Sequence, residues 1–99
     1  MPHSTEYLRL LDQHDCHLLL ERGVPVGRLK GDVLSLITPE GRPLTLQTPQ
    51  GFRGLAQPPR TVLDDYLAAH FVAQDGPADD DGREIYRLTD DGRKAARAV

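Results

Sequence analysis

The most informative segment of this sequence is Ile85-Tyr86-Arg87-Leu88-Thr89-Asp90-Asp91-Gly92-Arg93. Its first half alternates apolar and polar residues, which predicts a half-buried strand over residues 84–88. Thr89 then stands where the N-cap of a helix is expected, so we predict a terminal helix from about Asp90 to Ala98. An acidic loop flanked by glycines, residues 76–82, separates this strand from an apolar helical segment, residues 61–72. The last third of the chain therefore predicts a helix, a loop, a strand and a second helix.

The composition is that of one ordinary globular domain. The chain has 99 residues, of which 38% are hydrophobic and 27% are charged, and this length supports one modest core. No apolar run approaches the roughly 20 residues that cross a bilayer, and the N-terminus lacks the pattern of a secretion signal. The single cysteine, Cys16, excludes an intramolecular disulfide. We therefore expect a cytoplasmic protein without a membrane partner.

The charge balance bears directly on nucleic-acid binding. Twelve basic residues face fifteen acidic ones, which gives a net charge of -3, whereas proteins that bind nucleic acids usually carry a basic surface. Basic residues are nevertheless concentrated locally. Residues 22–60 hold six basic and two acidic residues, and residues 83–99 hold five basic and three acidic ones. Binding to DNA would depend on this local segregation of charge.

The N-terminal third allows two interpretations. Apolar residues recur at roughly helical spacing at Tyr7, Leu8, Leu11, Leu18 and Leu19, and the segment Gly23-Val24-Pro25 is a strong helix stop. The first interpretation is thus a helix over about 5–22. In the second, the helix ends near His14, and residues 18–21 and 24–29 form a hairpin. Leu18-Leu19-Leu20 fits either one.

The middle of the chain predicts short elements between turns. Residues 32–38 are expected to form a short helix that stops at Pro39, and residues 44–47 alternate as a half-buried strand does. A second short helix is expected from Thr48 to about Leu55, because a threonine followed by a proline is typical of a helix start. The helix over 61–72 should begin with a capping box of Thr61 and Asp64. Its expected apolar face is Val62, Leu63, Tyr66, Leu67 and Phe71.

This order of elements resembles that of winged helix-turn-helix proteins, and in particular the MarR-like and PadR-like bacterial regulators. The resemblance covers about residues 32–99. Its carriers are Val33-Leu34-Ser35-Leu36-Ile37 as the first helix, Gly41-Arg42-Pro43-Leu44-Thr45 before the second, Arg60-Thr61-Val62-Leu63 at the start of the third, and Tyr86-Arg87-Leu88-Thr89 with Gly92-Arg93 after the wing. The segment corresponding to the second helix contains Pro49, Gly51 and Gly54, each of which is costly inside a helix.

The resemblance implies an α+β winged-helix fold, with a three-helix core, a small antiparallel wing and an N-terminal helical extension. Residues 32–99 would be the winged-helix domain. Residues 1–31 would be an extension whose apolar residues either form a homodimer through its helix or only cover the core of the domain itself. It also implies a small DNA-binding protein that regulates transcription. The third helix would enter the major groove and the wing would contact the backbone. The candidate residues for contacting double-stranded DNA are Arg53, Gln57, Arg60, Thr61, Arg83 and Arg87.

The acidic residues favour an alternative. Asp64 and Asp65 lie on the exposed side of the expected third helix, and residues 79–81 would put three carboxylates at the wing tip. Such charges repel phosphates, so the alternative is a protein-interaction module that meets a basic partner at the acidic wing, without specific DNA binding.

Other chemistry has little support in the sequence. The segment His14-Asp15-Cys16-His17 contains possible metal ligands, but a structural zinc site needs four that converge. Residues 79–82 resemble part of a calcium loop and lack its glutamate. No phosphate-binding loop or nucleophile motif occurs. We therefore expect neither an enzyme nor a cofactor nor a metal.

Overall fold

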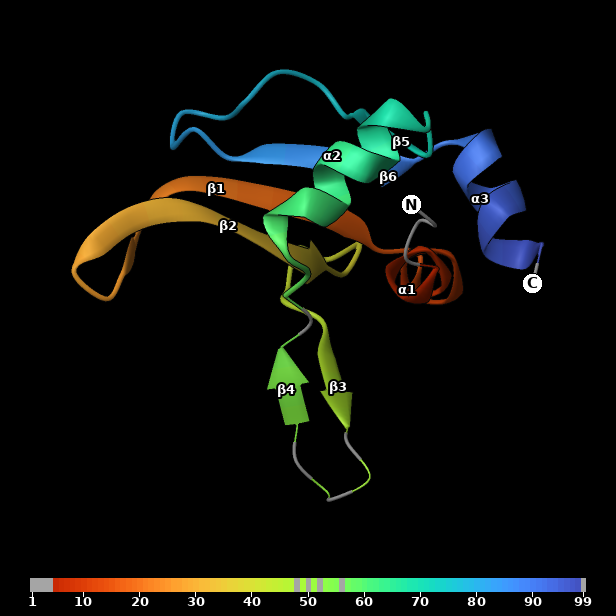
Figure 1. Cartoon of the computed structure of the whole chain (residues 1–99), viewed down its shortest axis with the longest axis horizontal. Helices are drawn as coiled ribbons and strands as arrows, with labels where there is room; N and C mark the ends of the chain where they lie inside the picture. Colours follow the sequence, from red (N-terminus) through yellow and green to blue (C-terminus); the bar gives the residue numbers. More distant parts are fainter. Residues whose placement is uncertain (1–4, 48, 50, 52, 56, 99) are drawn as a thin grey trace.

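A computed structural model of the chain describes residues 5–47, 49, 51, 53–55 and 57–98. The elements are α1 (Glu6–His14), β1 (His17–Val26), β2 (Leu29–Ile37), β3 (Thr45–Gln47), β4 (Arg53–Leu55), α2 (Arg60–Ala68), β5 (Val72–Gln74), β6 (Glu84–Leu88) and α3 (Asp90–Arg97). Four strands form an antiparallel sheet in the order β2-β1-β6-β5, and β3 and β4 form a separate hairpin. In Figure 1, α2 crosses one face of this sheet, and α1 and α3 lie side by side at one end.

The expected winged-helix fold is wrong. The structure is α+β, but strands dominate it, and the described elements run helix, strand, strand, a small hairpin, helix, two strands and a helix. The predicted helix over 32–38 lies on β2 instead, and residues 53–55 of the predicted second helix form β4. Positions 48, 50 and 52 of that predicted helix lie outside the described residues. The expected N-terminal helical extension is in fact one short helix followed by a long strand.

The first helix is much shorter than the leading prediction of residues 5–22. Asp15 adopts the left-handed conformation, with φ of 54°, and the Cys16 N–H donates to the Leu11 carbonyl at 3.1 Å, which is a regular way to end a helix. The alternative break near His14 was therefore correct. Its hairpin turn was misplaced, because β1 continues past Gly23 and turns only at Gly27 and Arg28.

Pairing between β1 and β2 explains why residues 32–38 are not helical. Leu18 lies opposite Leu36, and Leu20 lies opposite Leu34. All four side chains are buried on the same face of the sheet, because partners in an antiparallel pair project to the same side. The intervening residues, such as Leu19 and Ser35, project to the other face and are partly exposed. An alternation that buries every second residue satisfies a strand and not a helix.

The core lies between this face of the sheet and the helices. α2 contributes Val62, Leu63 and Tyr66, as predicted, and α1 contributes Leu8 and Leu11. The predicted capping box is wrong: α2 begins at Arg60, and its N-cap is Pro59, without a side-chain hydrogen bond. The helix also ends at Ala68, before the predicted Val72. Two residues of the predicted apolar face differ: Leu67 is 37% exposed, and Phe71 packs against the core from beyond the end of the helix.

The C-terminal segment agrees with its prediction. β6 and α3 occupy the expected positions, and the Thr89 hydroxyl accepts a hydrogen bond from the Gly92 N–H at 3.0 Å. The same hydroxyl donates to the His70 carbonyl at 2.6 Å, and the Thr89 N–H donates to the Phe71 carbonyl at 2.9 Å. Gly92 is buried directly against this Phe71 carbonyl. The Leu-Thr-x-x-Gly-Arg pattern therefore fastens α3 to the chain between α2 and β5.

Candidate functional site

One feature that projects from the sheet is a two-stranded arm. β6 pairs with Leu18, Leu19 and Leu20 of β1, so among the described residues β1 and β2 continue beyond the four-stranded sheet as a ribbon paired only with itself. We call residues 21–33 the arm. Its end lies at the far left of Figure 1. The boundary expected between an extension and a domain, at residues 31 and 32, falls inside β2 and within this arm.

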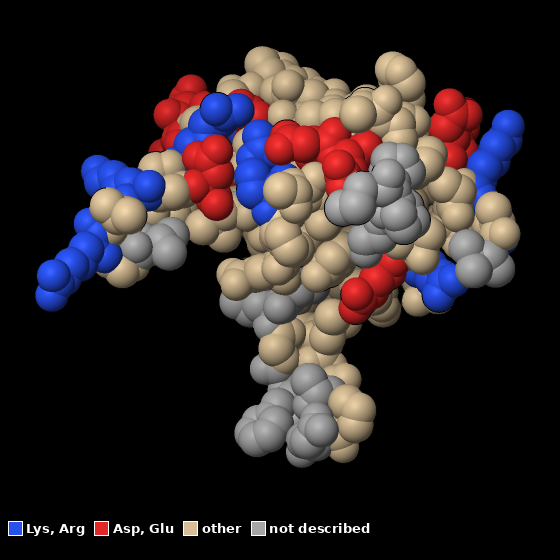
Figure 2. All heavy atoms as spheres, viewed as in Figure 1, with Lys and Arg blue, Asp and Glu red and all other residues tan. Residues whose placement is uncertain are grey.

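The tip of the arm is basic with an apolar centre. Gly27 has a φ of 63° and Arg28 has a negative one, which is the pattern of a two-residue hairpin turn with glycine in first place. Leu29 is 77% exposed, and it stands between Arg28 and Lys30. Neither cation has an ion pair or a side-chain hydrogen bond within the described part of the chain. Figure 2 shows these basic side chains projecting at the left end of the molecule.

The outer edge of β2 has free backbone groups. At the far end of this strand, the Leu36 carbonyl accepts from the Leu44 N–H at 2.9 Å, and the Thr38 N–H donates to the Arg42 carbonyl at 2.7 Å. Even-numbered residues of β2 therefore point their N–H and C=O groups away from β1, because these groups alternate sides along a strand. Lys30 and Asp32 follow the same alternation. Their outward groups have no protein partner among the residues that the structure describes.

The opposite edge of the arm is blocked. Pro25 lies opposite Lys30 in the β1–β2 pair, so its backbone nitrogen points away from β2. A proline carries no N–H and cannot donate to an added strand, which is a common protection of exposed sheet edges. Only the β2 edge of the arm is thus open to pairing. In Figure 1 no other element lies along that edge near the tip.

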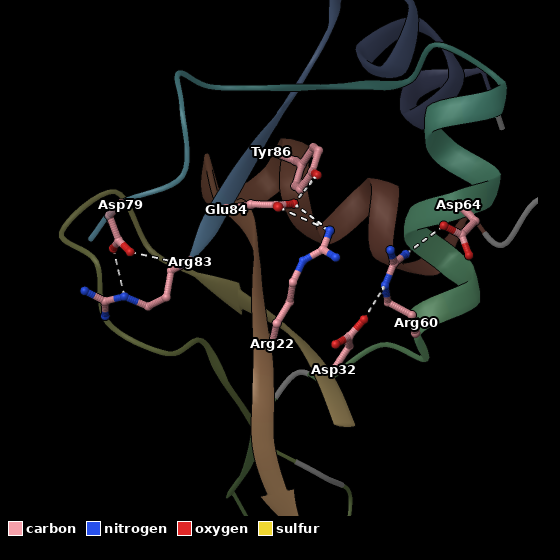
Figure 3. A network of polar contacts seen from close by, with 8 residues as sticks. All are labelled: Arg22, Asp32, Arg60, Asp64, Asp79, Arg83, Glu84 and Tyr86. Atoms are coloured by element: carbon pink, nitrogen blue, oxygen red, sulfur yellow. Dashed lines mark hydrogen bonds and ion pairs between the residues drawn. The ribbon is translucent and has the colours of Figure 1, made fainter. Parts of the chain in front are cut away.

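The base of the arm is held by polar contacts on the face covered by α2 (Figure 3). Arg22 of β1 forms an ion pair with Glu84 of β6, with Nη2 and Oε1 3.2 Å apart. The Tyr86 hydroxyl donates to Glu84 Oε2 at 2.6 Å. Arg60 of α2 binds Asp64 at 2.7 Å and lies 3.8 Å from Asp32 of β2. Both strands of the arm are therefore tied to the sheet or to α2.

These contacts make the base of the arm sensitive to acid. The hydrogen bond from Tyr86 lowers the pKa of Glu84 below its usual 4.5, against the effect of desolvation, and Arg22 lowers it further. Burial and the same hydrogen bond raise the pKa of Tyr86. Because the pKa of Glu84 is lower in the folded state, its stabilising effect is present above its unfolded pKa. That effect is lost as the pH falls through the folded pKa.

We expect Tyr86→Phe to lower the free energy of unfolding by about 1 kcal/mol at neutral pH, because it removes a hydrogen bond to a carboxylate. The difference from the wild type should be smaller at an acidic pH below the lowered pKa of Glu84, where this carboxylate is protonated. Urea denaturation at the two pH values measures both effects. Tyr7→Phe is the matched control, since the Tyr7 hydroxyl has no hydrogen-bond partner in the described part of the chain. An equal loss at both pH values would contradict this role for Glu84.

The predicted DNA-contacting residues are mostly engaged with acids. Arg60 binds Asp64; Arg83 binds Asp79 at 2.9 Å and lies 3.5 Å from Asp81; Arg87 lies 4.0 Å from Asp75. The structure brings together only Arg60 and Thr61, which are consecutive on α2. Gln57 is exposed in the connection before that helix, and Arg53 lies on β4, with its side chain outside the described part. Figure 2 shows acidic side chains gathered over α2.

The acidic loop explains the position of Arg83. The Asp79 carboxylate accepts hydrogen bonds from the Arg83 and Asp81 N–H groups at 2.9 and 3.0 Å. These bonds and the Arg83 side chain lower the pKa of Asp79. The loop is thus organised around its own arginine, and two of its three consecutive aspartates are paired with that residue.

A small hollow lies near the other end of β1. It has a volume of about 140 Å³ and is lined by Leu11, Asp12, Asp15, Cys16, His17, Arg87, Leu88 and Arg93. Its lining contains two acids and two arginines, and Asp12 is already bound by Arg97 at 3.0 Å. Burial raises the pKa of the Cys16 thiol, which disfavours the reactive thiolate. Among the described residues, no three His, Cys, Asp or Glu side chains converge on a metal position.

The arm residues that form the candidate site were missed in the sequence. Arg28 and Lys30 were counted only in the local charge balance, and Leu29 was placed only at the end of a misplaced hairpin. The available signal was the Gly27-Arg28 pair between two apolar runs, which is compatible with a tight hairpin turn. The direction of the Lys30 and Asp32 backbone groups has no sequence signal.

No protein-family model, curated protein or solved structure matches the chain. None of the described helices is long and apolar enough to cross a membrane.

Proposed function

We propose that the protein is an interaction module that binds an extended segment of a protein partner along the outer edge of β2. The observation that carries this proposal is the pair of outward-facing residues, Lys30 and Asp32, whose backbone donors and acceptors are unused within the described chain. Strand addition to an open sheet edge is a recurring mode of peptide recognition. A buried and unpaired Cys16 fits a reducing compartment, so the proposal places this module in the cytoplasm.

The chemistry of the tip defines the partner. Arg28 and Lys30 form no ion pair with the described residues, so they favour a segment that carries carboxylates, while Leu29 favours an apolar side chain beside them. Each backbone hydrogen bond contributes only about 0.5–1.5 kcal/mol net. A short paired segment therefore binds with a Kd of about micromolar to millimolar.

DNA binding through the arm is the second candidate, with a role in transcription as its consequence. A basic β-ribbon can enter a groove, and an apolar side chain at its tip can wedge between base steps. The specific observation that favours it is the sequence of an exposed cation, Leu29 and a second exposed cation. The net charge of -3 and the ion pairs of Arg60, Arg83 and Arg87 weigh against it, because they leave a small basic surface.

Fluorescence anisotropy separates the two candidates. One probe is a labelled peptide of about 7 residues that alternates valine and glutamate, and the other is a labelled duplex of about 20 base pairs. We expect the peptide to bind, and the same peptide with every backbone amide N-methylated not to bind, since neither of its edges can then donate to the β2 edge. Binding of the duplex alone, weakened from about 50 to about 200 mM salt and lost in Arg28→Ala, would establish the second candidate. No binding of the valine-glutamate peptide at millimolar concentration would overturn the first.

A further inference from the structure

We infer that the segment bound at the β2 edge is β2 of a second copy of this chain, paired antiparallel about Gly31. This inference rests on the proposed strand addition and adds the identity of the partner. It is argued from the sequence of the edge, from the direction of its backbone groups and from the exposure of Leu29.

The edge sequence is complementary to itself when reversed. Residues 29–33 read Leu29-Lys30-Gly31-Asp32-Val33, an apolar residue, a base, a glycine, an acid and an apolar residue. Antiparallel pairing centred on Gly31 puts Lys30 of each copy opposite Asp32 of the other. Opposite charges across a strand pair are stabilising, and like charges are destabilising. The two-fold arrangement contains this favourable pair twice.

Backbone direction selects the same register. Lys30 and Asp32 both point outward, so they form a hydrogen-bonded pair across the two copies, and each pair exchanges two N–H···O bonds. If the pairing were centred on Asp32, the two Asp32 residues of the dimer would lie opposite each other. If it were centred on Lys30, the two lysines would lie opposite each other. In a register that places even-numbered residues opposite odd-numbered ones, the outward N–H and C=O groups of one copy would face residues whose own backbone groups point toward β1. Over residues 29–33, only the register centred on Gly31 both places opposite charges across the pair and matches the outward backbone donors and acceptors of the two copies.

The pairing also covers the exposed tip. Leu29 and Val33 lie on the face of β2 away from α2 and become partners across the two copies. The 77% exposed side chain of Leu29 would then contact an apolar neighbour. Its face of the sheet continues through Leu19 and Ile85, which are partly exposed. The interface uses the same residues on both copies, so it closes as a two-fold dimer and leaves no further edge of this kind open.

Asp32 can pair with Lys30 of a second copy although it also lies near Arg60 of α2. Asp32 is 3.8 Å from Arg60, which has a much closer partner in Asp64 at 2.7 Å. The Asp32 side chain is 40% exposed, so it can also meet Lys30 of the second copy.

Sedimentation velocity over a range of protein concentrations tests this register with charge exchanges. We expect the wild type to dimerise, and Lys30→Asp or Asp32→Lys to weaken the dimer by about tenfold or more, because each puts like charges opposite each other twice. A one-to-one mixture of the two variants should form a heterodimer with both pairs restored. The double variant K30D/D32K should dimerise like the wild type. Arg9→Asp and Asp80→Lys make the same charge changes on exposed residues outside the arm and should have no effect.

A wild type that stays monomeric at near-millimolar concentration would overturn the inference, as would single variants that dimerise normally or a mixture that fails to associate. Circular dichroism of each variant confirms that the fold is intact. The peptide experiment keeps the two claims separate. Peptide binding by a monomeric protein would retain strand addition and reject a second copy as the partner, whereas a dimer insensitive to these exchanges would place the contact elsewhere.

Discussion

Gly92→Ala is expected to destabilise the fold by about 2 kcal/mol, although alanine is the better helix former. A Cβ atom at this position would press into the Phe71 carbonyl and come within 2.8 Å of Leu88 Cδ1. The Phe71 carbonyl belongs to the backbone and also accepts the Thr89 N–H at 2.9 Å, so it cannot move without loss of that bond. Overpacking of this kind costs about 1–3 kcal/mol, which exceeds the gain of about 1 kcal/mol from helix propensity.

Urea denaturation measures this change, with Gly54→Ala as the matched control. Gly54 lies on β4, has no left-handed φ, and a Cβ there meets nothing within 4 Å. We expect the control to change the free energy of unfolding by less than about 0.5 kcal/mol. Stability at or above that of the wild type in Gly92→Ala would show that α3 does not depend on close contact with the chain at Phe71.

Asp32→Pro is expected to weaken association at the β2 edge by about tenfold or more while leaving the arm folded. The Asp32 N–H points away from β1, so its loss removes a donor needed by an added strand but none used within the arm. Asp32→Asn keeps the N–H and loses only the charge, so it should weaken binding of the valine-glutamate peptide far less than the proline variant does. Val33→Pro removes an N–H that faces β1 and should unfold the arm.

Peptide anisotropy and circular dichroism together measure these outcomes. We expect the affinity of Asp32→Pro to fall by about tenfold or more, with an unchanged circular dichroism spectrum. If Asp32→Pro bound the peptide as well as Asp32→Asn does, the open edge would not be the binding surface.

Local signals predicted the C-terminal elements, most of α2 and the strand β3, whereas non-local pairing overruled the helices expected over residues 15–22 and 32–38. The alternation at residues 84–88 and the Thr89 cap act within a few residues, so β6 and α3 follow from the sequence. Leu18-Leu19-Leu20 and residues 33–37 fit a helix or a strand equally well by pattern. The structure resolves them as strands because Leu18 and Leu20 bury their side chains beside Leu36 and Leu34. That pairing joins two segments whose partnership the pattern of each alone does not reveal.

The Leu-Thr-x-x-Gly-Arg pattern shows how a local resemblance can mislead about the whole fold. Thr89 and Gly92 satisfy a capping bond and a close approach to Phe71. These requirements apply to any strand followed by a helix that packs in this way. The pattern was therefore a correct guide to β6 and α3 but did not determine the elements before them.

The candidate site was harder to predict from the sequence than the fold was. Arginines are typical of phosphate-binding surfaces, which is why Arg60, Arg83 and Arg87 were candidates. In the structure each of them lies beside at least one aspartate. The open edge depends on which residues of β2 point away from β1. That direction is set by the register between β1 and β2, and the identity of the side chains does not indicate it.

Amide hydrogen exchange at single-residue resolution, measured by NMR at low and high protein concentration, tests the central claim most directly. If the β2 edge takes a second strand, the Lys30 and Asp32 amides should become protected as the concentration rises, while Gly31 and Val33, which already face β1, should change little. Unchanged exchange at Lys30 and Asp32 over a range in which the protein is seen to associate, or new protection confined to α1 or β5, would contradict the account.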